Sequence, residues 1–105
     1  MIHPTAVIGK NVEIGEGTVV MANAVINPAT SIGDHCIINT ACSIDHDGEI
    51  SDFVHISPRA ALGGNAKIGD STWLGLGALI RNDISIGENS IVGMGSVVLK
   101  SIGGV

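Results

Sequence analysis

The chain has 105 residues, which is enough for one domain, and we expect that domain to span residues 1–105. With 15 glycines, one Trp and one Phe, the composition favours short strands joined by tight turns and argues against a helical bundle. The net charge of −5, five basic residues, and the lack of a signal peptide or a membrane-spanning run indicate a cytoplasmic protein with no nucleic-acid or membrane partner.

Branched aliphatic residues recur at every sixth position from the start of the chain. The series fills all seventeen positions and is followed, four residues after each member, by a mostly small side chain. Its members are Ile2, Ile8, Ile14, Val20, Ile26, Ile32, Ile38, Ile44, Ile50, Ile56, Leu62, Ile68, Leu74, Ile80, Ile86, Val92 and Val98. This period predicts a solenoid of short strands with inward aliphatic residues, in which three sides form a triangular coil of eighteen residues. The chain would then make nearly six coils.

Two further details follow from the repeat. Glycine often comes directly after the aliphatic residue, as in Ile14-Gly15 and Ile68-Gly69, and we attribute it to turns that need a permissive backbone. Cys36 and Cys42 occupy successive small inward positions on different sides of the triangle, so we expect buried thiols and no disulfide.

Residues eighteen apart should stack into outward columns, and these columns divide the surface into one polar and two apolar faces. The polar face carries Glu13, Ser31, Glu49, Lys67 and Ser85. The apolar faces carry Val7, Val25, Ser43, Ala61, Leu79 and Val97 on one side, and Val19, Ile37, His55, Trp73 and Ile91 on the next. Two adjacent apolar faces that share a corner, from Pro4 to Met94, predict a homotrimer packed around that corner.

The stretch Ile44–Pro58, IDHDGEISDFVHISP, contains two histidines among carboxylates. His46 falls in a turn column with Gly64, Asn82 and Lys100, whereas His55 falls on an apolar face beside Trp73. In one subunit the histidines lie at opposite edges of the apolar surface, and a trimer would bring His46 of one chain towards His55 of the next. From these residues alone, His46 can also be a solvated turn residue, and His55 an interface residue against its Trp neighbour.

These motifs resemble those of the hexapeptide-repeat acyltransferases, and more narrowly the sialic acid O-acetyltransferase and UDP-amino-sugar N-acetyltransferase group. The similar stretches are Ile44–Asp47, Val54–Pro58 and Leu62–Asn65. The resemblance implies a left-handed parallel β-helix that forms a trimer. It also implies that His46 is a general base oriented by Asp47 or by Asp45, that His55 contacts the acyl thioester, and that the Gly64 amide stabilises the oxyanion.

The implied chemistry is consistent with the residue types. A neutral imidazole beside a carboxylate accepts a proton at neutral pH, and a backbone N–H stabilises developing negative charge. The column of Gly64, Asn82 and Lys100 offers a small-sided track for a pantetheine arm, with Lys100 or Arg81 near the phosphates. Because the spacing of the histidines differs from that of zinc-dependent β-helix enzymes, we expect no metal.

We therefore expect an acyl-CoA-dependent acyltransferase, with acetyl-CoA as donor, that acts on an amine or hydroxyl of a small, sugar-like acceptor. The sequence does not identify the acceptor or decide between N- and O-acylation. Members of the group also carry an N-terminal nucleotide-sugar-binding domain and a C-terminal segment that this sequence lacks. Two alternatives thus stay open: a shortened acyltransferase that at most binds CoA, and a non-catalytic trimeric β-helix scaffold.

Overall fold

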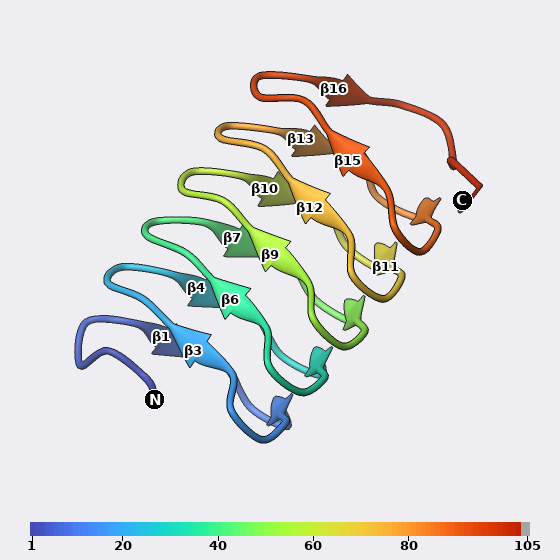
Figure 1. The fold of residues 1–105 in the computed structure, drawn as a ribbon. Coiled ribbons are helices and arrows are strands. Elements are labelled where there is room, and N and C mark those ends of the chain that lie inside the picture. The colour runs from blue at the N-terminus through green and yellow to red at the C-terminus, as the bar shows by residue number, and fades with distance from the viewer. Residues whose placement is uncertain (104–105) are drawn as a thin grey trace.

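Residues 1–103 of the computed structural model form a solenoid of two-residue strands that rises from the N-terminus to the C-terminus (Figure 1). The strands are β1 (Val7–Ile8), β2 (Glu13–Ile14), β3 (Val19–Val20), β4 (Val25–Ile26), β5 (Ser31–Ile32), β6 (Ile37–Ile38), β7 (Ser43–Ile44), β8 (Glu49–Ile50), β9 (His55–Ile56), β10 (Ala61–Leu62), β11 (Lys67–Ile68), β12 (Trp73–Leu74), β13 (Leu79–Ile80), β14 (Ser85–Ile86), β15 (Ile91–Val92) and β16 (Val97–Val98). The longest dimension is 33 Å. None of these residues forms a helix that is long and apolar enough to cross a membrane.

The strands assemble into three parallel sheets, one on each side of the triangle. Sheet B has the order β1-β4-β7-β10-β13-β16, sheet C the order β2-β5-β8-β11-β14, and sheet A the order β3-β6-β9-β12-β15. Within the sheets, each strand residue pairs with the residue eighteen positions along, for example Ser43 with Ala61 and His55 with Trp73. The last bridge, Ile86 with Ile102, is shorter by two residues. The predicted all-β parallel β-helix with eighteen-residue coils is therefore confirmed.

The core is the inside of the coil, as the six-residue period predicts. In each strand the first residue points outward and the second inward, because successive side chains of a strand alternate. The aliphatic series is buried from Val20 to Val98, whereas Ile8 and Ile14 are partly buried and Ile2 is 48% exposed in the first coil. Both cysteines are buried and free, and burial raises the pKa of the Cys42 thiol to about 12.

The turns differ from the sequence-based interpretation in the role of glycine. From the turn at residues 10–11 to the turn at 94–95, the left-handed backbone falls on the second residue, and twelve of these residues are not glycine, among them Ala29 at φ 64° and Asp47 at φ 57°. Gly15 and Gly69, which follow the aliphatic residues, have no such backbone. A Cβ on Gly69 would instead lie 2.5 Å from the backbone nitrogen of Glu88 in the next coil. These glycines are therefore needed for close approach of successive coils and not for turn geometry.

The two apolar faces are exposed on the surface of the chain. On sheet A and its corner the exposed fractions are 51% for Trp73, 80% for Ile91 and 76% for Met94, and on sheet B they are 47% for Leu79 and 60% for Val97. The inward core does not use these side chains, so a large apolar surface is left over on two adjacent sides of the triangle.

Candidate active site

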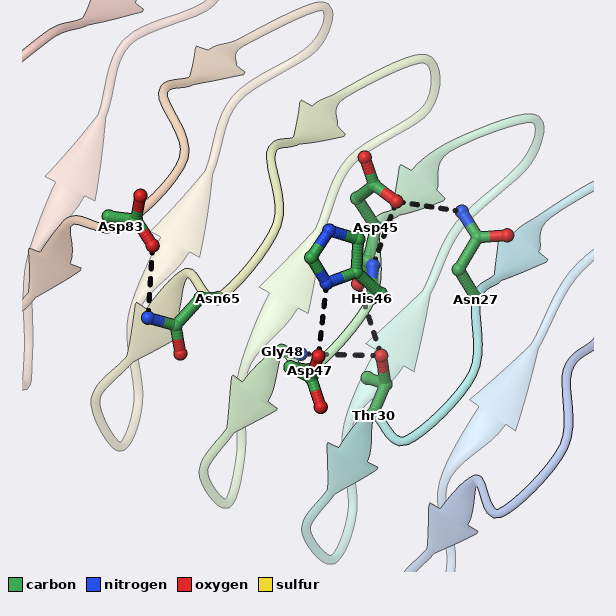
Figure 2. A network of polar contacts seen from close by, with 8 residues as sticks. All are labelled: Asn27, Thr30, Asp45, His46, Asp47, Gly48, Asn65 and Asp83. Carbon is green, nitrogen blue, oxygen red and sulfur yellow. Dashed lines mark hydrogen bonds and ion pairs between the residues drawn. The ribbon is translucent and has the colours of Figure 1, made fainter.

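His46 lies in the turn between β7 and β8, where sheet B meets sheet C (Figure 2). The Asp45 carboxylate accepts a hydrogen bond from the backbone N–H of His46 at 2.8 Å, and Asn27 of the coil below donates to the same carboxylate oxygen at 3.4 Å. Asp45 thus holds the backbone of the turn. Its carboxylate is hydrogen-bonded to the main chain and to Asn27 and not to the imidazole.

Asp47 is the carboxylate that contacts the imidazole. Its Oδ2 lies 3.0 Å from Nδ1 of His46, and Asp47 itself has the left-handed backbone of the turn, at φ 57°. This hydrogen bond is the main reason why the pKa of His46 is raised, and the nearby charges of Asp45, Asp47 and Asp83 add to it. A neutral His46 that donates from Nδ1 to Asp47 has its lone pair on Nε2. Of the two aspartates that the sequence offers as partners of His46, Asp47 is thus the one that hydrogen-bonds to the ring, whereas Asp45 bonds to the backbone.

Gly64 lies next to the imidazole, one coil further along the chain. A Cβ at this position would come within 2.7 Å of both Cε1 and Nε2 of His46, so any larger residue here would push the exposed ring out of its present position. The Gly64 carbonyl accepts from Asp83 N, but within residues 1–103 its own N–H donates to no protein acceptor. Nε2 of His46 and an unused backbone donor thus lie at the same corner.

A buried hydroxyl supports the turn from inside the coil. Thr30 Oγ1 donates to the carbonyl of Asp45 at 3.1 Å and accepts from the N–H of Gly48 at 3.4 Å. These two groups flank the His46 turn on either side. The inward column therefore fixes the turn that carries the candidate base.

The corner also contains polar residues that the sequence analysis does not single out. Asp83 accepts from the side-chain amides of Asn65 at 3.0 Å and Asn82 at 2.8 Å, and these bonds hold the pKa of its carboxyl below the usual range. Asp47, Asn65 and Asp83 are eighteen residues apart and share one column. Reading this second turn column along with that of His46 would have identified Asn65 and Asp83 as neighbours of Asp47.

His55 occupies a different environment on β9 of sheet A. Its ring stacks on Trp73 with the centroids 5.4 Å apart and the planes 14° from parallel, and Nε2 lies 3.2 Å from Asn39 Nδ2. Partial burial lowers the pKa of His55. The ring borders an apolar pocket of about 440 Å³, whose other walls include Trp73, Leu76, Ile91 and Met94.

The remaining candidate residues lie further along the corner. Asn82 and Lys100 follow Gly64 in the turn column at successive intervals of eighteen residues, and both are exposed. Arg81 follows β13 and is also exposed, and its charge contributes to the lowered pKa of Asp83. Within a single chain, none of these residues forms a hydrogen bond with His46 or His55. Among residues 1–103 no group of three or more His, Cys, Asp or Glu side chains is arranged to hold a metal ion.

Comparisons with known proteins identify similar folds. Residues 65–100 match the family model described as bacterial transferase hexapeptide (six repeats), and no curated protein sequence matches the chain. The acetyltransferase domain of PglB from Neisseria gonorrhoeae, also solved with acetyl coenzyme A, is 41% identical over 97% of this chain and 50% of that chain, with a TM-score of 0.96. PerB from Caulobacter crescentus, solved with CoA and GDP-perosamine, is 39% identical over 99% of this chain and 50% of that chain, with a TM-score of 0.93. WeeI from Acinetobacter baumannii is 35% identical over 96% of this chain and 50% of that chain, with a TM-score of 0.93.

This chain thus spans about half the length of the proteins that it matches. The predicted resemblance to the hexapeptide-repeat acyltransferases is confirmed by the repeat and by these structures. The coil also has the same hand as theirs, because a solenoid of opposite hand would not superpose at these TM-scores.

Proposed function

We propose that this chain, which carries the bacterial transferase hexapeptide repeat, is an acyl-CoA-dependent acyltransferase with acetyl-CoA as donor. The observation that carries the proposal is the His46–Asp47 pair, with Nδ1 and Oδ2 3.0 Å apart, placed over the open backbone of Gly64. This arrangement combines a base with a free N–H donor at one corner of the coil. It matches what acyl transfer from a thioester requires.

In this mechanism His46 acts as the general base through Nε2. The acceptor nitrogen or oxygen attacks the thioester carbonyl while its proton passes to Nε2, and Asp47 stabilises the imidazolium that forms. The Gly64 N–H donates to the carbonyl oxygen as it becomes negative. Collapse of the tetrahedral intermediate breaks the C–S bond, and the departing thiolate receives the proton from Nε2 of His46.

The donor would lie along the turn column beyond Gly64. Asn82 has a short polar side chain that leaves space for the pantetheine arm, and the exposed cations Lys100 and Arg81 are suited to its phosphates. His55 would contact the acyl thioester from sheet A of the neighbouring subunit. The solved structure of the PglB domain with acetyl coenzyme A supports the choice of donor.

A homotrimer completes this site. His46 and His55 lie on different sides of one chain, and the exposed apolar faces of sheets A and B adjoin at the corner that holds Leu76 and Met94. Packing sheet B of one subunit on sheet A of the next would bury these faces and bring the two histidines together. The active site would then lie between subunits.

The proposed acceptor is a small molecule with an amine or hydroxyl on a sugar-like ring. GDP-perosamine bound to PerB supports a nucleotide-linked amino sugar, which favours N-acylation. We propose that the chain acts as a single domain in the cytoplasm. This is where acetyl-CoA and nucleotide sugars are available.

The test is calorimetric titration of the purified protein with acetyl-CoA, followed by turnover with a panel of nucleotide-linked amino sugars. We expect about one site per subunit and turnover that is lost in His46→Ala, while the β-helix and its oligomeric state are unchanged. His3→Ala is the matched control, because the His3 ring is only partly buried and its side-chain hydrogen bonds are both to Thr5. Undiminished turnover in His46→Ala would exclude the base assignment, and no binding at millimolar acetyl-CoA would exclude the donor.

A further inference from the structure

Asn39 contacts the ring of His55, one of the two histidines of the candidate site. The hydrogen bonds of its side-chain amide allow only one orientation of that amide. Asn39 Oδ1 accepts from the backbone N–H of Thr40 at 2.7 Å and from the Thr40 hydroxyl at 3.2 Å. A backbone N–H is always a donor, so the atom that faces it must be the amide oxygen. The other end of the same amide, which points at His55, is therefore the NH₂ group.

This orientation determines which nitrogen of His55 carries the proton. Asn39 Nδ2 lies 3.2 Å from Nε2 of His55, and an NH₂ group can only donate. Nε2 must then accept with its lone pair, so the ring is neutral with its proton on Nδ1. A proton on Nε2 would place two donors against each other.

The surroundings of the ring favour the same state. One face of His55 stacks on Trp73, and partial burial disfavours the imidazolium. No hydrogen-bond partner of Nδ1 is found among residues 1–103, and no buried side-chain nitrogen or oxygen in this part of the chain lacks a partner. Nδ1 is therefore open to solvent or to a ligand, with an N–H to donate.

We propose that Asn39 is a positioning residue that holds His55 as the neutral Nδ1–H form, and that this N–H is the group offered to the carbonyl oxygen of the acyl thioester. The inference rests on the proposed function for the identity of the ligand, but the tautomer itself does not. Thr40 contributes by fixing the orientation of the Asn39 amide. A chain of hydrogen bonds thus runs from Thr40 through Asn39 to the His55 ring. His55 and Gly64 would then be two neutral donors to one oxygen, while His46 alone accepts a proton.

The same geometry occurs one coil further along, which provides a matched control. Trp73 Nε1 donates to Ser57 Oγ at 2.9 Å, and Ser57 precedes Trp73 by sixteen residues, as Asn39 precedes His55. Ser57→Ala removes a bond of the same kind from the neighbouring ring. It leaves Asn39 and its bond to His55 in place.

The experiment is nitrogen NMR of the full chain with ¹⁵N-labelled histidine, at a pH where His55 is neutral and without ligand. The signal of His55 is assigned by its loss in His55→Gln. We expect a protonated Nδ1 and an unprotonated Nε2 in the wild-type protein and in Ser57→Ala. In Asn39→Asp a carboxylate oxygen faces Nε2 and can only accept, so the proton should move to Nε2.

An unprotonated Nδ1 in the wild-type protein, or the same tautomer in folded Asn39→Asp, would overturn the inference. In turnover, Asn39→Ala should lower kcat/KM for acetyl-CoA by about tenfold, the equivalent of one hydrogen bond, while Ser57→Ala should not. Equal rates for Asn39→Ala and the wild-type protein would overturn the positioning role. An inactive wild-type protein would instead overturn the proposed function, and the tautomer would still be measured.

Discussion

The two histidines of the candidate site have pKa values that are shifted in opposite directions by their surroundings. His46 is exposed, bonded to Asp47 and close to other carboxylates, so its pKa is raised. His55 is partly buried against Trp73, so its pKa is lowered. The first environment suits a residue that gains a proton during the reaction, and the second suits one that stays neutral.

The raised pKa of His46 predicts a specific pH profile. A general base must be neutral, so activity should rise with pH through the pKa of His46. Asp47→Asn removes the main cause of the raised pKa, so the acidic limb of the profile should move to lower pH, and kcat at its plateau should fall by about tenfold because the ring loses its orienting carboxylate. Steady-state kinetics across the pH range measure both effects.

Asp45→Asn is the control for this experiment. An Asn oxygen at position 45 can still accept from the His46 N–H, so only the charge is lost. We expect a smaller movement of the acidic limb, since the charge of Asp45 ranks after the Asp47 hydrogen bond among the causes of the shift. Equal profiles for Asp47→Asn and the wild-type protein would show that Asp47 does not support the base.

At this scale the sequence predicted which residues occur at the corner but not how they bond. Column reading placed His46 over Gly64, and His55 beside Trp73, because the eighteen-residue register is regular. It did not predict the Asn39 contact to His55 or the bonds from Asn65 and Asn82 to Asp83. Such contacts depend on side-chain rotamers and amide orientations, which a repeat pattern does not specify.

At the scale of the turn and strand, the sequence analysis placed the coils correctly and assigned the wrong role to glycine. The period of six predicted strands, register and core because every inward position must be filled by a residue of suitable size. The left-handed turn position is held mostly by residues other than glycine. The turns of successive coils stack on one another and are joined by hydrogen bonds. Bonds such as that from Asn65 N to His46 O at 2.8 Å help to hold the strained backbone.

Removing a Cβ from such a turn should stabilise the protein. Ala29 is exposed and has φ 64°, so Ala29→Gly should raise the free energy of unfolding by up to about 1 kcal/mol as the left-handed strain is relieved. The control is Ala78→Gly, at a fully buried position outside the left-handed region, which should lower it by about 1 kcal/mol. Denaturant titration of both variants would show opposite signs, and a loss of stability in Ala29→Gly would contradict the turn geometry.

The inward hydroxyls offer a test of how the core supports the site. Thr30→Val keeps the shape but removes the bonds to Asp45 O and Gly48 N, which should cost about 1–3 kcal/mol and lower activity by loosening the His46 turn. Thr72 makes the same pair of bonds, to Gly87 O and Ser90 N, away from His46. Thr72→Val should therefore cost similar stability without a comparable loss of activity, and equal activity losses in the two variants would contradict a local effect.

At the scale of the whole molecule, the main consequence of the fold is the apolar surface left on two sides of the triangle. Leu79→Glu, on the apolar face of sheet B, should break a trimer because a charge would be buried in the interface. Ser85→Glu, on the polar face of sheet C, is the control and should leave the assembly unchanged. Sedimentation analysis would distinguish monomer from trimer. A Leu79→Glu protein that stays trimeric would place the interface elsewhere.

Such a monomer should still be folded, since the inward aliphatic series is buried within one chain. We expect Leu79→Glu to keep the β-sheet circular dichroism of the wild-type protein but to lose turnover, because His46 and His55 would no longer meet. Activity in a confirmed monomer would contradict a site between subunits. This variant therefore separates assembly from folding, which substitutions in the core do not.

The constant register between coils also limits how such a chain can change its length. From β1 to β16 the strand residues pair with those eighteen positions away, so inserting or deleting eighteen residues returns each later side chain to the same side of the triangle. An insertion or deletion of six residues keeps the core pattern intact but moves all later residues to the next side of the triangle. If it occurred before His55, both His55 and Trp73 would move off the face of sheet A. Internal duplications that preserve the site should therefore add whole coils of eighteen residues, although the core alone would tolerate additions of six residues.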